Sequence, residues 1–281
     1  MLANIALHGL ETDLKELIRR NGWSSSRRGV GVHVVRYADD FIITCQTKEQ
    51  AERLIPVVAD WLWTHAGVEL NREKTRITHI ADGFDFLGFN LRKYQDTLLI
   101  KPAKASQLAF LRKVKALLDA HRMVSTETLL QLLNPLLRGW ASYYRSVVSK
   151  QVFTYCDYRL YQMLWRWAKR RHPTKSAHWV KAKYFAQRGR RHWVFTDGQH
   201  DLFQLAAVPI IRHVKVQGRR SPYRAADAPY FEHRRTQLLI TRWTALQQRV
   251  AAKVAAPYVP APSRNPGLAS RTTRVVFGFT K

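Results

Sequence analysis

Cysteine is scarce in this sequence: its 281 residues include only two, Cys45 and Cys156, and no Cys-x-x-Cys pair. We therefore expect neither a disulfide framework nor a zinc site. Long apolar segments are also lacking, since no run of 18 apolar residues occurs and the first residues show no basic segment followed by an apolar stretch. This pattern predicts a cytoplasmic protein with no membrane span, no secretory signal and no membrane partner.

Acidic residues are rare in the second part of the chain. Residues 1–100 hold 13 Lys and Arg against 13 Asp and Glu, whereas residues 101–281 hold 34 against 7, so the later part carries the whole net charge of +27. This excess is far larger than solubility requires and indicates a polyanionic partner. The nine Trp and 11 Tyr favour nucleic acid over a membrane surface, because bases stack on aromatic rings while phosphates meet Arg and Lys.

The order of elements in the first hundred residues predicts an α+β fold. Apolar residues at three- and four-residue spacing predict helices over residues 2–20 and from Thr47 to Gly67. Thr47 and Gln50 together resemble a capping box at the start of the second helix. Between the two helices, β-branched and aromatic residues over 32–45 predict a β-hairpin. Further strands are expected at residues 68–70, 75–80 and 83–89. This order indicates an antiparallel sheet with helices on one face.

From residue 104 the apolar pattern becomes helical. Leucine spacing predicts two helices, the second interrupted by Pro135, and an aromatic-rich helix is expected over about residues 151–171. Gly and Pro break up residues 189–236, which predicts short strands and loops. Residues 237–255 are expected to be helical again, and the tail from Pro257 is expected to be disordered.

The predicted hairpin carries two adjacent acidic residues at its turn, Asp39 and Asp40. Both follow an apolar strand, so the turn must bring their carboxylates to solvent, a cation or a substrate. Asp is common in turns for local reasons, because its side chain accepts hydrogen bonds from nearby backbone amides. A carboxylate pair at the edge of a sheet also suits the two Mg²⁺ ions, about 3.5–4 Å apart, that polymerases use. The two residues alone leave both interpretations open.

The sequence around this turn resembles a known family. Tyr37-Ala38-Asp39-Asp40 resembles the catalytic box of reverse transcriptases and, with Arg36 and Phe41 beside it, the form found in group II intron-encoded proteins. Other blocks similar to that family follow in the expected order, at residues 2–7, 70–75, 84–89, 133–144 and 165–173. The chain thus resembles a group II intron reverse transcriptase/maturase over most of its length.

The resemblance implies a domain organisation. Residues 1–100 would form a partial polymerase palm, and residues 101–125 would form the connection to the thumb and the first thumb helix. Residues 126–236 would form the helical thumb and the helical maturase domain, called domain X. Residues 237–281 would form a basic C-terminal helix and a disordered tail.

The resemblance also implies roles for particular residues. Asp39 and Asp40 are expected to be catalytic and to bind Mg²⁺, with Asp39 the more direct ligand. Tyr37, Ala38, Lys74 and Gly88 are expected near the active site. Clustered cations bind phosphates because they release counter-ions, and the aromatic trio of the maturase block fits either a core stripe or a base-stacking surface. The expected nucleic-acid contacts are Arg138, Trp140, Tyr143, Tyr144, Arg145, Arg166, Lys169, Arg170, Arg171 and Lys175.

The sequence departs from the family pattern in two places. The family's palm carries a third metal-binding carboxylate on an earlier strand, and the resemblance begins after that block, which implies an N-terminally truncated protein with one carboxylate ligand missing. We therefore expect little or no polymerisation by this chain alone, because the chemistry depends on positioned charge. A partner chain could supply the missing fingers and palm. The Cys-rich HNH endonuclease of many relatives is not expected either.

Several functions follow from the resemblance. The first is RNA-templated DNA synthesis, using an RNA template, a DNA primer or target and deoxynucleotides, combined with intron RNA binding that promotes splicing and retrohoming. An alternative of another class is a non-catalytic RNA-binding maturase or splicing factor, or a degenerate fragment, and the charge distribution favours it. Retron or CRISPR-associated reverse transcriptases and nucleotide cyclases are further alternatives, but the maturase block and the basic helical extension argue against them.

Overall fold

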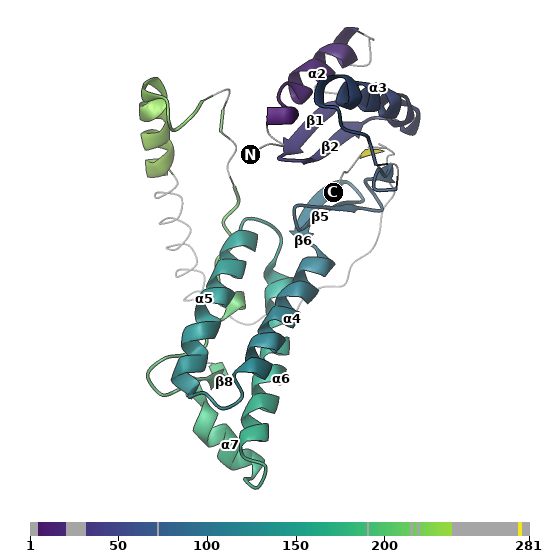
Figure 1. The fold of residues 1–281 in the computed structure, drawn as a ribbon. Coiled ribbons are helices and arrows are strands. Elements are labelled where there is room, and N and C mark those ends of the chain that lie inside the picture. The colour runs from purple at the N-terminus through teal and green to yellow at the C-terminus, as the bar shows by residue number, and fades with distance from the viewer. Residues whose placement is uncertain are drawn as a thin grey trace. The chain divides into compact units, whose positions relative to one another are not determined.

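The computed structural model describes residues 5–20, 32–71, 73–189, 191–213, 216–217, 220–237 and 275–276. The chain divides into two compact units, one formed by Met1–Arg212 with Ala269–Lys281 and the other by His213–Leu268. The first unit holds small antiparallel sheets and six α-helices, α2 to α7, among its described residues, which agrees with the predicted α+β class (Figure 1). Among the described helices, none is long and apolar enough to cross a membrane.

The first sheet is built on the predicted hairpin. β1 (His33–Tyr37) and β2 (Asp40–Cys45) pair antiparallel, and the sheet continues through β9 (Val275–Val276) to β3 (Thr78–His79). Val34 of β1 is buried while its neighbours His33 and Val35 are exposed, as the two-residue period of a strand requires. The sheet was expected to contain only residues of the first hundred, so β9 shows that part of the C-terminal tail is strand rather than disordered.

Two helices pack on this hairpin (Figure 1). α2 (Leu10–Arg20) and α3 (Lys48–Ala66) place Leu14 and Leu54 in one core with the strand residue Ile43. The indole nitrogen of Trp61 in α3 donates to the Asp13 carboxylate in α2 at 3.1 Å, which fixes one helix against the other.

The ends of α3 follow the sequence signals. The Thr47 hydroxyl accepts from the Gln50 amide at 3.2 Å, and Gly67 ends the helix with a φ of 62°. The Gln50 side chain accepts from the Gln46 amide at 3.1 Å instead of completing the reciprocal bond to Thr47. Pro56 lies inside the helix, which continues through it. The N-terminal cap and the end at Gly67 are therefore confirmed.

The strands expected after α3 are shorter than the sequence suggests. Residues 68–71 form no strand, and of residues 75–80 only Thr78 and His79 pair with another strand. The side chain of Asn71 accepts from the backbone amides of Glu73 and Lys74 at 3.0 and 3.2 Å. The Thr75 amide, which belongs to the expected second strand, also donates to the Asn71 carbonyl oxygen at 3.0 Å, so this turn competes with strand formation.

A second sheet follows, formed by β4 (Phe84–Phe86), β5 (Phe89–Tyr94) and β6 (Thr97–Pro102) in sequence order. The β element expected over residues 83–89 is confirmed as the hairpin turn between β4 and β5, with Phe86 opposite Phe89. Its two turn residues, Leu87 and Gly88, have φ values of 50° and 78°. A two-residue turn with both φ values positive matches the right-handed twist of the strands that it joins.

Four helices form the second core. α4 (Lys104–Ala120), α5 (Thr126–Tyr144), α6 (Lys150–Arg171) and α7 (Ala177–Tyr184) bury an apolar cluster that includes Val114, Leu133, Leu160 and Val180. The helix expected over residues 151–171 is confirmed as α6. α5 continues through Pro135, and its N-terminal cap is Ser125, whose hydroxyl accepts from the Thr128 amide at 3.1 Å.

A second hairpin and short helical turns follow α7. β7 (Phe185–Arg188) pairs with β8 (Arg191–Phe195), and η1 (Leu205–Ala207) packs on α6. In the second unit, η2 (Ala225–Asp227) precedes a helical stretch over residues 228–237, where the sequence predicted strands and loops. The helix expected over residues 237–255 lies almost wholly outside the described residues, as does most of the tail from Pro257.

Candidate functional site

The two acidic residues lie where the first hairpin turns. Tyr37 pairs with Asp40 at the end of the ladder, so Ala38 and Asp39 form a two-residue turn, and Ala38 has a φ of 55°. The guanidinium of Arg36 donates through Nη1 to the Ala38 carbonyl oxygen at 2.9 Å. The motif therefore stabilises its own turn, because its Arg satisfies a carbonyl that the turn leaves outside the ladder.

The electrostatics of the turn favour a bound cation. Partial burial, and then the negative charge of Asp39, raise the pKa of Asp40 above its ordinary value. Two adjacent carboxylates repel each other, and a cation between them would remove the repulsion. Both side chains are half-buried, so an ion could still reach them from solvent.

The donor chemistry of the turn fits Mg²⁺, because Mg²⁺ prefers hard oxygen ligands and usually takes one or two carboxylates together with water or phosphate oxygens. Among the described residues, however, no group of three or more His, Cys, Asp or Glu is placed to hold a metal ion. Asp39 and Asp40 alone would therefore supply only part of the ligands of a metal site, and the others would have to come from water, substrate phosphates or another chain.

Lys74 lies in the turn organised by Asn71. The Lys74 amide donates to the Asn71 side chain and to its carbonyl oxygen, both at 3.2 Å, and its own side chain is half-buried. The Thr75 hydroxyl closes the same turn with a 2.7 Å bond to the Asn71 carbonyl oxygen. These bonds give the Asn71–Thr75 part of the motif a local structural role, and the position of Lys74 near an active site stays a prediction.

Gly88 is held by a tyrosine pair from α5. The Tyr143 hydroxyl donates to the Leu87 carbonyl oxygen at 2.9 Å, and the Tyr144 hydroxyl donates to the Gly88 carbonyl oxygen at 3.1 Å. A Cβ added to Gly88 would lie 2.8 Å from the Tyr144 hydroxyl and 3.0 Å from the Ser106 hydroxyl. Glycine is therefore required here both by its positive φ and by the close approach of two side chains.

The three residues of the expected base-stacking trio differ in their exposure. The Tyr144 side chain is 4% exposed, and the Trp140 ring stacks on Phe110 at a centroid distance of 4.4 Å. Tyr144 therefore packs in the helical core, whereas Trp140 is half-buried and lines an open pocket between α4 and α5, so a contact between Trp140 and nucleic acid stays a prediction. Tyr143 is 53% exposed, so a contact between this residue and nucleic acid stays a prediction.

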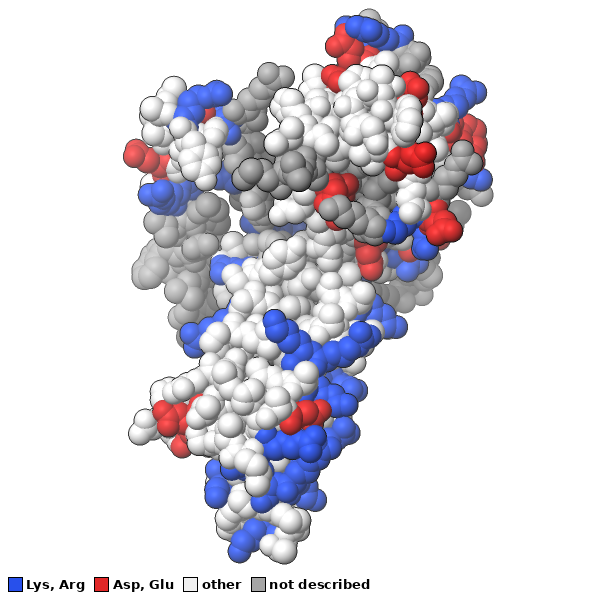
Figure 2. Space-filling model, viewed as in Figure 1, with Lys and Arg blue, Asp and Glu red and all other residues white. Residues whose placement is uncertain are grey.

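A basic groove runs between α4 and α6. It encloses about 440 Å³ and carries six cationic side chains against the single acid Asp119. Figure 2 shows Lys and Arg gathered on the viewed face of this helical part. Five of the cations come from the two helices and Arg122 comes from the loop after α4; the full set is Lys115, Arg122, Arg159, Arg166, Arg170 and Arg171.

These six cations are not equivalent. Nη1 of Arg170 lies 3.6 Å from the Asp119 carboxylate, so part of its charge is already compensated. Nη1 of Arg171 donates to the carbonyl oxygens of Arg122 and Val124 at 2.9 and 2.6 Å, and its guanidinium lies 4.6 Å from the centroid of the Trp167 ring. Arg171 therefore fixes the loop after α4 to the end of α6.

The remaining expected contacts lie outside the groove. Arg138 is exposed, with its guanidinium 5.3 Å from the centroid of the Phe203 ring, whereas Arg145 is half-buried. Lys169 and Lys175 are exposed, and the Lys175 ammonium lies 5.6 Å from the centroid of the Trp179 ring. The structure does not bring the ten expected residues into one surface.

Three groove residues were not predicted from the sequence: Lys115, Arg122 and Arg159. Arg159, Arg166 and Arg170 follow one another at intervals of seven and four residues, so they share a face of α6. That spacing alone predicts a basic face on α6, which is longer than the dense cationic run at the end of the helix. Lys115 and Arg122 carried no such signal, since only the packing of α4 on α6 brings them to this groove.

Two known protein families match different parts of the chain. The reverse transcriptase (RNA-dependent DNA polymerase) family matches residues 1–91, which include Asp39, Asp40 and Gly88. The group II intron maturase-specific domain matches residues 107–185, which include every cationic residue of the basic groove. No curated protein matches the chain. With both domains present in this order, the chain belongs to the group II intron reverse transcriptase/maturase family.

Proposed function

We propose that this chain binds group II intron RNA through the basic groove and thereby promotes splicing of the intron. The observation that carries the proposal is the convergence of six cations from α4, the loop after it and α6 around one acid. Each phosphate that a cation neutralises releases condensed counter-ions, so clustered cations bind RNA more strongly than the same number spread over a surface. Arg159 and Arg166, both exposed, are the residues most free to meet phosphates.

Filter binding with the full chain tests this function. A group II intron RNA and an unrelated structured RNA of equal length would be titrated at several salt concentrations. We expect tighter binding to the intron RNA and a logarithmic salt slope of several units, since single-stranded contacts contribute about 0.7 each and duplex contacts about 0.9. Weak binding that salt does not change would overturn the proposal.

RNA-templated DNA synthesis is the second candidate function, and the acidic turn is the observation that favours it. Asp39 and Asp40 would hold Mg²⁺, which in polymerases stabilises the charge that develops on the transferred phosphate. The chain's own part is to fix the two carboxylates on a tight turn, which Arg36 supports through its bond to the Ala38 carbonyl. RNA template, DNA primer and deoxynucleotides would be the substrates, and retrohoming the process served.

The two family matches support a domain assignment, which we propose as follows. Residues 1–100 would be a partial palm, 101–125 the connection with the first thumb helix, 126–236 the thumb and domain X, and 237–281 a basic C-terminal segment. A partner chain carrying fingers and a further palm carboxylate would complete the metal site, because Asp39 and Asp40 supply only part of the ligands.

Primer extension separates the two candidates. The purified chain would be given an RNA template, an annealed DNA primer, deoxynucleotides and Mg²⁺, with Asp39→Asn as the matched control. We expect little or no extension by the chain alone. Extension by the wild-type chain that Asp39→Asn abolishes would instead show that this chain polymerises by itself, and RNA binding would then be only one part of its function.

A further inference from the structure

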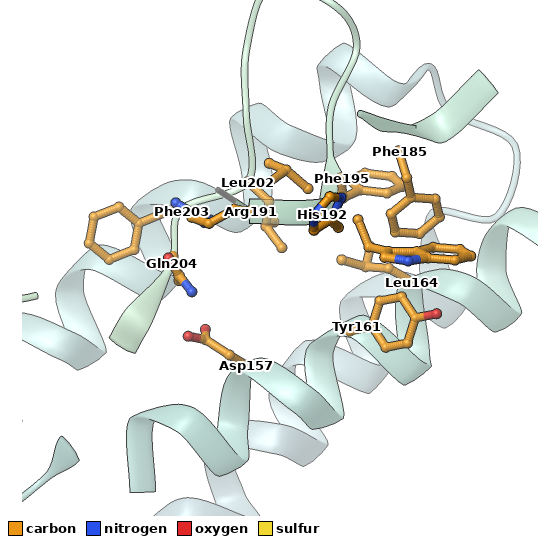
Figure 3. Close-up of a pocket in the computed structure, with 12 residues that line it drawn as sticks. Asp157, Tyr161, Leu164, Phe185, Arg191, His192, Phe195, Leu202, Phe203 and Gln204 are labelled. Carbon is orange, nitrogen blue, oxygen red and sulfur yellow. The ribbon is translucent and has the colours of Figure 1, made fainter. Parts of the chain in front are cut away.

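A second cavity, separate from the basic groove, opens between α6, the β7–β8 hairpin and residues 202–204. It encloses about 190 Å³, below the 300–1,000 Å³ of ordinary small-molecule sites. Its occupant is therefore limited to about one ring system. Figure 3 shows Asp157 and Tyr161 on one helix, with Phe185 and His192 across the opening from them.

Aromatic rings dominate the lining of this cavity. Trp193 is its most accessible large ring, 39% exposed. The ring of Tyr161 meets it edge to face at a centroid distance of 5.9 Å, and Trp165 supports it at 5.6 Å. These contacts hold the indole in place while leaving part of its surface to solvent. A flat aromatic occupant would stack on such a ring.

The backbone at Trp193 is specialised. Between the pairs Ala186↔Val194 and Arg188↔Arg191, one residue of β7 stands opposite two residues of β8, His192 and Trp193. Trp193 has a φ of 65°, a conformation that bulky residues rarely adopt. Bulges of this kind redirect a side chain, and strained residues cluster at functional sites. The bulge is what allows Trp193 to line the cavity.

Polar groups complete the cavity. The Asp157 carboxylate accepts from the Leu205 and Ala206 amides at 3.0 and 2.8 Å, and a carboxylate offers about four acceptor positions, so it can take further donors. Gln204 lies opposite it (Figure 3). Cations stand at the rim: Arg191 is exposed, and the Lys181 ammonium lies 4.5 Å from the centroid of the Trp193 ring.

We propose that this cavity binds one unpaired guanine base of the RNA, stacked on Trp193 and hydrogen-bonded to Asp157. Guanine presents two donors side by side, N1–H and the N2 amino group, and these match a carboxylate better than the single amino group of adenine or cytosine. Arg191 and Lys181 would meet the flanking phosphates. The proposal rests on the RNA-binding function, and it adds a site that selects a base to a groove that binds backbone.

The test uses the full chain and three 12-nucleotide oligouridylates that carry one central guanosine, inosine or adenosine. Inosine keeps N1–H and lacks the N2 amino group. We expect the guanosine strand to bind at least about ten-fold more tightly than the other two, the lower end of what a hydrogen bond to a charged group contributes.

Two variants make the result specific. Trp193→Gly removes the ring, and its positive φ suits glycine, so the fold should be retained. Trp63→Ala removes another exposed tryptophan ring, 61% exposed, from α3, far from the cavity in sequence, and is the matched control. We expect Trp193→Gly to abolish the preference for guanosine and Trp63→Ala to keep it.

The outcomes are distinguishable. Equal affinity for the three strands, or a preference that survives Trp193→Gly, would overturn the guanine site while leaving RNA binding intact. A chain that binds none of the strands at low salt and also fails to bind intron RNA would contradict the proposed function itself. A chain that binds intron RNA but no oligonucleotide at low salt would also count against the guanine site.

Discussion

The Tyr144 hydroxyl in α5 donates a 3.1 Å hydrogen bond to the Gly88 carbonyl oxygen at the turn between β4 and β5. This bond joins a residue matched by the maturase-specific domain to one matched by the reverse transcriptase family. The Ala103 amide donates to the same carbonyl at 2.9 Å. The glycine motif therefore serves as a docking point for the helical part of this unit.

Gly88→Ala is expected to destabilise this unit strongly. The new Cβ would lie 2.8 Å from the Tyr144 hydroxyl in a residue with a φ of 78°. Gly189→Ala is the matched control, since Gly189 has a φ of 60° and no atom within 4 Å of its added Cβ. Thermal unfolding should show that Gly88→Ala lowers the free energy of unfolding by about 1–3 kcal/mol more than the control does, the usual range for overpacking. Equal losses would mean that only the backbone conformation matters.

Tyr144→Phe should partly compensate for Gly88→Ala. Alone, Tyr144→Phe removes one hydrogen bond and should lower the free energy of unfolding by about 1 kcal/mol. In the double variant the hydroxyl that the new Cβ would meet is gone, so the combined loss should be smaller than the sum of the two single losses. A double-mutant cycle by urea unfolding measures this coupling, and strictly additive losses would contradict the contact.

Arg159→Gln and Arg166→Gln are expected to weaken RNA binding without affecting stability. Both residues line the basic groove and are exposed. Each lost phosphate contact should reduce the logarithmic salt slope by about 0.7–0.9. Arg53→Gln removes an exposed arginine from α3 and is the control. The same salt slope in all three variants would show that RNA does not occupy the groove.

Arg171→Gln is expected to act on stability. The arginine donates to two backbone carbonyl oxygens of the loop after α4, and bonds from a charged donor are stronger than neutral ones. We expect a loss of about 1–2 kcal/mol in the free energy of unfolding, measured by chemical denaturation. Lys169→Gln, which removes an exposed neighbouring cation, should leave stability unchanged. The opposite ranking would refute the structural role of Arg171.

Asp40→Asn should raise the melting temperature at neutral pH. Burial and the Asp39 charge raise the pKa of Asp40 in the folded protein, so the folded state loses stability as pH rises through that pKa and the carboxyl ionises. The difference between variant and wild type should shrink as pH falls and Asp40 becomes protonated. Thermal unfolding at several pH values measures it, and a variant less stable than wild type at neutral pH would contradict the repulsion.

Several features followed from the sequence because they depend on neighbouring residues. The hairpin with Asp39 and Asp40 at its end, the cap at Thr47 and the helix over residues 151–171 are all set by periodicity and local hydrogen bonds. The prediction of a strand at residues 68–70 was wrong, and of residues 75–80 only Thr78 and His79 form a strand. A strand needs a pairing partner, and the sequence of the strand itself does not show which segment will pair with it. The same limit hid β9, whose partners lie about 200 residues away.

The sequence by itself determined the family blocks, the neutral first part and the basic second part, since these are properties of order and composition. Only the tertiary structure decided which side chains act together. It buried Tyr144 in the helical core, bonded Arg171 to the loop after α4, and brought Lys115 of α4 to the same groove as Arg166 of α6. The physical reason is that burial and convergence depend on which helix faces pack together, and residues distant in sequence set that packing.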